Sequence, residues 1–224
     1  MSWTEKPWIH RCTYQHCLHY NGVVDHTVST INEAMGDSYE STKELKPLSA
    51  MLSYIRQRDE RAFLLINQRF HNSFITFLMK RVTHLGSMPF VFVLLFVVGI
   101  LPVIRETSLQ EDLALRLLVS HSIVQLIKVT VHRKRPFCQL EKVFSASVPA
   151  CQYSFPSGHT NAAFVTAFTL SAYYPGLKGL FLITAFLVAV SRIYLGVHYP
   201  ADTIVGTLIA YLVTTGFSAW ILFL

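Results

Sequence analysis

The sequence predicts an all-α fold: an integral membrane bundle of about six transmembrane helices, preceded by an interfacial N-terminal helix. The 224 residues are 52% hydrophobic and only 14% charged, whereas ordinary soluble domains carry about 25% charged residues. Mean hydropathy is +0.39. The apolar residues are also grouped in long blocks, and such blocks cross lipid as helices because helices pair all their backbone groups internally.

Two domains are expected: a polar, flexible extension over residues 1–49 and a membrane domain over residues 50–224. The extension has no periodic apolar pattern and no basic region followed by an apolar stretch, so we expect no cleavable signal peptide. Its cysteines and histidines match no well-defined zinc-finger spacing. They are His10, Cys12, His16, Cys17, His19 and His26.

The first part of the membrane domain is the least regular. Residues 50–61 place Met51, Leu52 and Ile55 on one side and charged residues mainly on the other, a pattern typical of a helix lying in the interface. Residues 62–79 are the weakest candidate for a span, because polar residues interrupt their apolar ones, namely Asn67, Gln68, Arg69, His71 and Asn72.

Five later segments are clear candidates for transmembrane helices, with lengths near those needed to cross a bilayer. They cover residues 88–104, 113–131, 160–174, 180–190 and 203–224. Three charged clusters lie at the ends of these segments, and an even number of crossings separates them, so they are expected on one membrane face. If the N-terminus is cytoplasmic and 62–79 spans, that face is extracytoplasmic; if 62–79 does not span, the assignment reverses.

The first cluster contains Lys128 and Arg135, followed by Pro136. Seven residues correspond to two helical turns, so we expect both cations on one helical face, with the proline closing the helix. Cations are costly near a bilayer and persist there mainly for function. A polar seam between helices or a snorkelling lysine remains an alternative for this cluster taken alone.

The second cluster is the run Pro156-Ser157-Gly158-His159. We expect Pro156 at the first position of the next helix, where free N–H groups form a ready anion site. Ser157 adds a hydroxyl donor, Gly158 lets a ligand approach the backbone, and His159 is a candidate general acid. A simple helix cap beside a chance histidine would explain the run equally well.

The third cluster joins Ser191-Arg192 to His198 and Asp202. An aspartate beside a histidine can orient the ring and increase the basicity of its second nitrogen. Such a histidine is a competent nucleophile towards phosphorus. The alternative, an aspartate favouring the positive end of a helix, does not account for the arginine upstream.

Taken together, the order and spacing of these clusters resemble a known signature. Lys-six residues-Arg-Pro, then Pro-Ser-Gly-His, then Ser-Arg-five residues-His-three residues-Asp is similar to the three-part signature of the type 2 phosphatidic acid phosphatase superfamily. The resemblance covers about residues 60–224, and every signature position matches. It implies a six-helix membrane bundle with its site on the extracytoplasmic face of the cell membrane.

The resemblance also implies a role for each residue of the signature. His198 would attack phosphorus and form a phosphohistidine, Asp202 would orient His198, and His159 would protonate the leaving oxygen. The remaining signature residues would bind the phosphate, namely Lys128, Arg135, Arg192, Ser157 and the Gly158 backbone. The family needs no metal ion, and no cofactor is expected.

The expected function is hydrolysis of a lipid phosphate or diphosphate such as phosphatidic acid, phosphatidylglycerophosphate or undecaprenyl diphosphate. A lipid phosphotransferase using the same site and a non-catalytic lipid-binding protein remain alternatives. A net charge of +6 favours contact with anionic headgroups, whereas no long basic run suggests nucleic acid as a partner. Cys138 and Cys151 flank one loop and could form a disulfide if that loop is extracytoplasmic.

Overall fold

The computed structural model describes residues 45–69, 72–100, 108–140, 143–145 and 153–221. Within these ranges the secondary structure is helical, apart from an isolated bridge that pairs Lys134 with Tyr153. Contacts divide the chain into two compact units, 1–62 and 63–224. Helix α2 (Leu45–Arg69) runs across this boundary. The domain division expected after residue 49 stays a prediction.

Residues 62–79 do not form the single span considered from the sequence. Helix α2 ends at Arg69, and a new helix, α3 (Ser73–Val82), begins after Asn72. The Asn72 side chain accepts a hydrogen bond from the Phe74 backbone N–H at 2.8 Å and so caps α3. The polar run that weakened this segment as a span therefore marks the break between two helices.

Helix α3 continues through a 3-10 turn, η2 (Thr83–Gly86), into α4 (Met88–Ile100). The two helical stretches meet at an angle of 56° and together are apolar enough to form one bent span. Gly86 lies inside the bend, where an added Cβ would be 2.5 Å from the His159 carbonyl oxygen. The glycine thus lets the bend approach the start of α8 closely.

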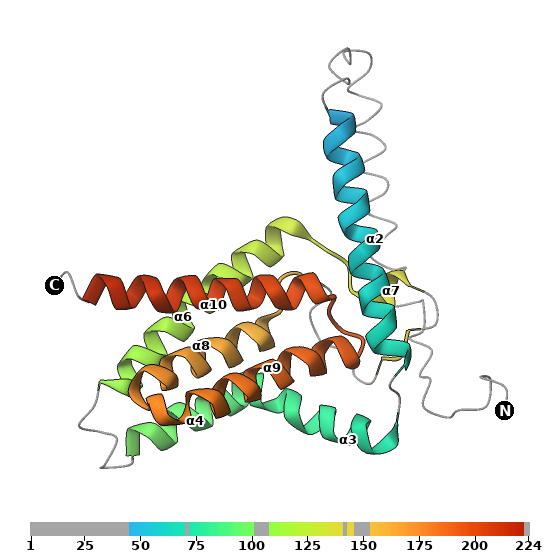
Figure 1. Cartoon of the computed structure of the whole chain (residues 1–224). Coiled ribbons are helices and arrows are strands. Elements are labelled where there is room, and N and C mark those ends of the chain that lie inside the picture. Colours follow the sequence, from blue (N-terminus) through green and yellow to red (C-terminus); the bar gives the residue numbers. More distant parts are fainter. Residues whose placement is uncertain (1–44, 70–71, 101–107, 141–142, 146–152, 222–224) are drawn as a thin grey trace. The chain divides into compact units, whose positions relative to one another are not determined.

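The centre of the second unit is α8 (Gly158–Tyr173), which packs against α6 (Leu109–Val131), α9 (Lys178–Tyr194) and α10 (Pro200–Ile221). Figure 1 shows α8 between α9 and α10. Small buried residues on α8 let its neighbours come close; they include Ala162, Ala163 and Ala167. Each of the five segments expected to span is helical over its described residues, apart from Tyr174 at the end of the third.

Some of the polar side chains inside this unit hydrogen bond with one another across helices. Asn161 on α8 donates to Ser120 Oγ at 2.7 Å and to the Gly206 carbonyl at 3.2 Å. Ser120 belongs to α6 and Gly206 to α10. One amide therefore links three helices where lipid offers no alternative partner.

Large apolar side chains cover the outward faces of these helices, as expected for a surface in contact with lipid. Examples are Phe92, Phe96, Leu118, Leu126, Leu180, Phe186, Ile204 and Leu208. Among the described helices, Leu109–Val131 and Pro175–Tyr194 are long and apolar enough to cross a membrane, and the bent pair adds a third. The predicted all-α membrane bundle is confirmed, whereas the number of six spans stays a prediction.

The turn between α9 and α10 is tied to the 143–145 segment. Gly196 has φ +78°, and an added Cβ would lie 2.1 Å from the Phe144 carbonyl oxygen. Phe144 is itself held by Asn67, which donates to its carbonyl and accepts from its N–H, both at 2.9 Å. Asn67 also donates to the Tyr194 carbonyl at 3.0 Å, so the end of α2, the 143–145 segment and α9 are joined.

We expect Gly196→Ala to lower the free energy of unfolding by about 2 kcal/mol or more, because it combines a left-handed φ with a backbone clash. The measurement is the thermal midpoint of the detergent-solubilised protein. Gly179→Ala is the matched control, since no atom lies within 4 Å of its added Cβ. Equal midpoints for the two variants would contradict the prediction.

Candidate active site

The residues singled out from the sequence lie at the ends of helices in the second unit. Lys128 is in the last turn of α6, Arg192 in the last turn of α9 and Asp202 in the first turn of α10. Arg135 caps the short helix α7 (Pro136–Gln139). The side chains of these residues are buried, as are those of Ser157 and His198. Burial of so many charged groups is costly unless they serve a ligand or one another.

Lys128 and Arg135 do not share one helical face, contrary to the sequence prediction. Helix α6 ends at Val131, and His132 follows it in the left-handed conformation with φ 50°. Pro136 does not close α6 but begins α7. Arg135 is extended, as is usual for the residue before a proline, and so it cannot continue a helix into Pro136. Arg135 is brought back towards the bundle by this turn.

Pro156 also lies outside the helix that it was expected to begin. It precedes Ser157, which is the N-cap of α8, and it follows Phe155 through a cis peptide bond. The Ser157 hydroxyl oxygen accepts from the Thr160 N–H at 3.4 Å and from the Thr160 hydroxyl at 2.9 Å. The Ser157 O–H can still donate a hydrogen bond. It lies beside N–H groups of the first turn of α8, which have no acceptor within the helix.

The surrounding protein does not explain a glycine at position 158. An added Cβ would meet Val124 Cγ1 at 3.9 Å, an ordinary contact. Space beside the Gly158 backbone is therefore available, which agrees with the close approach of a ligand predicted from the sequence. At Gly206, by contrast, a Cβ would lie 2.7 Å from the Ser157 carbonyl oxygen, so α10 packs directly against the start of α8.

The hydrogen bonds of Arg135 define the tautomer of His198. Arg135 Nη1 donates to the Val197 carbonyl at 2.8 Å and contacts His198 Nε2 at 3.3 Å. A guanidinium has only donors, so Nε2 is the acceptor and the neutral ring carries its proton on Nδ1. The nitrogen with a free electron pair therefore faces the cation.

The other ring nitrogen of His198 faces Asp202. The distance from Nδ1 to Oδ2 is 3.4 Å, and both side chains are buried. This contact does not meet the geometry of a hydrogen bond, so Nδ1 is a buried polar atom without a hydrogen-bond partner among the described residues. The carboxylate lies beside Nδ1, the nitrogen through which an aspartate can orient a histidine ring.

Burial lowers the pKa of His198 well below its usual value, and the charges of Arg135, Arg192 and Lys128 lower it further. The nearby Ser154 backbone acts in the opposite direction and raises the pKa. The ring is consequently neutral near pH 7, as a nucleophile must be. Its position in the turn before α10 also places it next to all three cations.

Arg192 connects the bend after α3 to the site. Its Nη1 donates to the Thr83 hydroxyl at 2.7 Å, while its Nε is buried and has no hydrogen-bond partner among the described residues. An orphaned charged donor of this kind is costly. It suits an oxyanion, which could accept from it directly. The Arg192 carbonyl accepts from the His198 N–H at 3.3 Å and so holds the turn in place.

His159 completes the set and is half-buried in the first turn of α8. Arg192, Arg135, Lys128 and His198 all lie close enough to act on it electrostatically. The Asp202 carbonyl accepts from the Ser157 N–H at 3.0 Å and joins the second cluster to the third. The structure thus brings the eight residues chosen from the sequence into one region.

Comparisons with known proteins identify the family. The model of the PAP2 superfamily matches residues 112–223. The chain belongs to the PAP2 superfamily. It is 34% identical over 161 residues to phosphatidylglycerophosphatase B of Bacillus subtilis, covering 65% of this chain and 73% of that protein. The resemblance inferred from the three clusters is therefore confirmed.

Two further PAP2 relatives are similar over different lengths. An undecaprenyl-diphosphatase of Sulfolobus acidocaldarius is 29% identical over 121 residues, covering 54% of this chain and 55% of that protein. The crystal structure of Aquifex aeolicus LpxE is similar with a TM-score of 0.62 and 30% identity, covering 69% of this chain and 91% of that one. The chain spans about half the length of the first curated relatives that it matches.

Three residues of this PAP2 site were not assigned from the sequence. Arg133 donates to Asp202 Oδ1 at 2.7 Å, Thr83 binds Arg192, and Ser154 hydrogen bonds with Asp202. The cation at position 133 was visible beside Arg135, but its spacing did not show which way it points. Thr83 and Ser154 gave no signal, since both lie outside the three clusters.

Two other expectations are not resolved by the structure. Among the described residues, no group of three or more His, Cys, Asp and Glu side chains could hold a metal ion; metal independence stays a prediction. Cys138 lies in α7, whereas Cys151, together with Cys12 and Cys17, lies outside the described residues. The disulfide between Cys138 and Cys151 therefore also stays a prediction.

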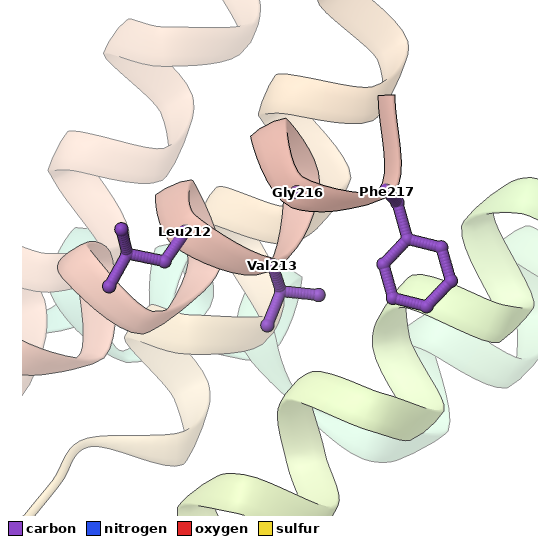
Figure 2. Close-up of a pocket in the computed structure, with 4 residues that line it drawn as sticks. All are labelled: Leu212, Val213, Gly216 and Phe217. Atoms are coloured by element: carbon purple, nitrogen blue, oxygen red, sulfur yellow. The ribbon is translucent and has the colours of Figure 1, made fainter. Parts of the chain in front are cut away.

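A cavity of about 350 Å³ lies along α10, away from the PAP2 site. Figure 2 shows its lining residues Leu212, Val213, Gly216 and Phe217, with the Phe217 ring directed towards α6. The first of them follows Asp202 by ten residues, which is nearly three helical turns. The lining is apolar and holds no group suited to phosphate chemistry.

Proposed function

We propose that this chain is an integral membrane phosphatase that hydrolyses a phosphate monoester or diphosphate of a lipid through a phosphohistidine. The observation that carries the proposal is the orientation of His198: its unprotonated Nε2 faces Arg135, and Arg192 and Lys128 lie nearby. Family membership and relatives that include an undecaprenyl-diphosphatase and a phosphatidylglycerophosphatase support it.

In the first step, the phosphate binds between Lys128, Arg135 and Arg192, with the Ser157 hydroxyl and the Gly158 N–H as further donors. The orphaned Nε of Arg192 gains a partner on binding. These fixed positive groups stabilise the charge that spreads over the phosphoryl oxygens in the transition state. The lipid chain stays outside the cluster, on the apolar side of the bundle.

In the second step, His198 Nε2 forms a bond to phosphorus while the bond to the lipid oxygen breaks. His159, which the negative charge of the bound phosphate keeps protonated among the surrounding cations, donates a proton to that oxygen. The oxygen leaves as the lipid alcohol or, from a diphosphate, as the lipid monophosphate. Asp202 stabilises the positive charge that develops on the His198 ring. Water then attacks phosphorus, gives a proton to His159, and releases inorganic phosphate with His198 restored.

The test is a phosphate-release assay of purified protein on phosphatidic acid, phosphatidylglycerophosphate and undecaprenyl diphosphate, with and without excess EDTA. We expect release from at least one lipid and rates unchanged by the chelator, because three cations supply the positive charge. Loss of activity in EDTA would contradict the metal-free mechanism. Consumption of the substrate only when an acceptor lipid is added, with the phosphoryl group recovered on that lipid and no inorganic phosphate released, would indicate a phosphotransferase. Binding without turnover would indicate a lipid-binding protein.

We further propose a multi-pass placement in the cell membrane, with the site on the extracytoplasmic face, as the family resemblance implies. Residues 62–79 do not form a span of their own, so the crossings counted from the sequence would reverse this face; the proposal therefore requires the end of α2 to lie on the extracytoplasmic side. Asn67 contacts Tyr194 and Phe144, so the chain enters the bundle at the same end as the site. The site therefore lies on the same side of the membrane as the C-terminal end of α2. Cleavage of a water-soluble phosphate ester by intact cells, equal to that by lysed cells, is the expected result.

A further inference from the structure

Arg133 binds the catalytic carboxylate. Its Nη1 lies 2.7 Å from Asp202 Oδ1, and the Asp202 side chain has no exposed surface. The other carboxylate oxygen, Oδ2, accepts from the Tyr199 N–H at 2.9 Å. Each oxygen of Asp202 therefore has a donor before His198 is considered, and the donor on Oδ1 is charged.

The position of Arg133 is itself restrained by its neighbours. Its guanidinium stacks over the Tyr199 ring, with 4.0 Å between the guanidinium carbon and the ring centroid. The Tyr199 ring packs edge-on against Phe63 at 5.5 Å. The Arg133 carbonyl accepts from the Ser154 N–H at 2.8 Å, next to the bridge formed by Lys134. Backbone and side chain are thus both held in the orientation that reaches Asp202.

The cations around the site divide into two groups by what they act on. Arg135, Arg192 and Lys128 act on His198, where the phosphate would bind. Arg133 acts on Asp202. A buried carboxylate with no cation beside it would take up a proton rather than stay charged. A protonated Asp202 would no longer stabilise positive charge on the His198 ring.

We propose that Arg133 is a positioning residue, which keeps Asp202 ionised and directed at His198 Nδ1 so that Nε2 faces the phosphate. This role rests on the proposed phosphatase function. Arg133 acts through Asp202 and does not bind the phosphate. Lysine at this position would keep the charge but lose the planar stacking on Tyr199.

The test compares Arg133→Gln and Arg133→Lys with Lys134→Gln, which removes the exposed cation next in the chain. We expect Arg133→Gln to lower kcat by about 10- to 100-fold, as for residues that orient a catalytic group, and Arg133→Lys to restore part of it. The acidic limb of the kcat/KM profile should move to higher pH, since the carboxylate has lost its cation. The inhibition constant of inorganic phosphate should stay within about twofold.

Two results would overturn the proposal. One is an inhibition constant for phosphate that rises as much in Arg133→Gln as in Arg135→Gln, which would make Arg133 a phosphate ligand. The other is an unchanged kcat and pH profile in Arg133→Gln, with Lys134→Gln as the reference.

A thermal-stability cycle of Arg133→Gln with Asp202→Asn, measured without substrate, separates this proposal from the function. We expect the two substitutions to be non-additive, because they remove the same ion pair. Additive effects would overturn the Arg133–Asp202 pairing. If the two substitutions are non-additive but the wild-type protein releases no phosphate, the pairing is supported and the phosphatase function is overturned.

Discussion

His198→Ala is expected to lower phosphate release by about 10⁴-fold or more, the largest effect of any single substitution in this chain. The variant loses the only atom that the mechanism joins to phosphorus. Arg135, Arg192 and Lys128 remain, so lipid phosphate should still bind. The measurement pairs steady-state phosphate release with capture of a labelled, acid-labile phosphoprotein, which wild-type protein forms and the variant does not.

The control for this substitution is His84→Ala, which removes an exposed imidazole after α3. We expect wild-type turnover from that variant. Because His198 is buried, its removal also leaves a cavity, so the thermal midpoint of each variant is needed to normalise the rates. Unchanged turnover in folded His198→Ala protein would exclude the phosphohistidine route.

The proximity of the signature residues could be predicted from the sequence, because the signature consists of residue types at fixed spacing; their roles stay a proposal. Lys128, Arg135, Arg192 and His198 were chosen before their positions were known, and the structure places them together. Helix ends explain why: each residue lies within a few positions of one end of an apolar segment. Topology alone then gathers those ends on one side of the bundle.

Local backbone geometry was predicted less well than the proximity of these residues. Pro136 and Pro156 were assigned by their usual helical preferences, but one begins α7 and the other precedes a serine cap. Both errors come from applying a propensity where a turn of the chain decides the outcome. The break before α3 has a signal in the sequence, because the polar residues up to Asn72 that make 62–79 a weak span also favour the start of a new helix.

The directions in which the side chains point could not be predicted from the sequence. Arg133 and Arg135 are two residues apart and chemically identical, yet one binds Asp202 and the other contacts His198. The two arginines point to different partners because of the backbone turn between α6 and α7. Similarly, nothing in the sequence indicated that Asn67 would bond to two segments more than seventy residues away.

The second large effect is expected at Arg116, whose substitution should destabilise the fold. Arg116 Nε lies 2.6 Å from Asp112 Oδ1, and the two side chains are only 4% and 9% exposed. Arg116 also donates to the Thr214 carbonyl at 3.0 Å, and Tyr173 donates to Asp112 at 3.4 Å. The pair therefore joins α6, α8 and α10 about 18 Å along α6 from Lys128, at 1.5 Å per residue.

Arg116→Ala or Asp112→Ala is expected to lower the free energy of unfolding by about 3–5 kcal/mol, because each leaves a buried charge without its partner. The double variant Arg116→Met/Asp112→Leu should cost less than either single substitution, since no unpaired charge remains. Thermal midpoints in detergent measure the differences. Phosphate release per folded molecule should stay near wild type in all three variants, because the pair lies far from His198.

An exposed ion pair of the same spacing provides the comparison. Arg56 and Glu60 are also four residues apart, with Nε 2.9 Å from Oε1, but the Arg56 side chain is 61% exposed. Arg56→Ala is expected to change stability by less than about 1 kcal/mol. If Arg56→Ala and Arg116→Ala lowered the midpoint equally, or if the double variant were the least stable, burial would not explain the effect at Arg116.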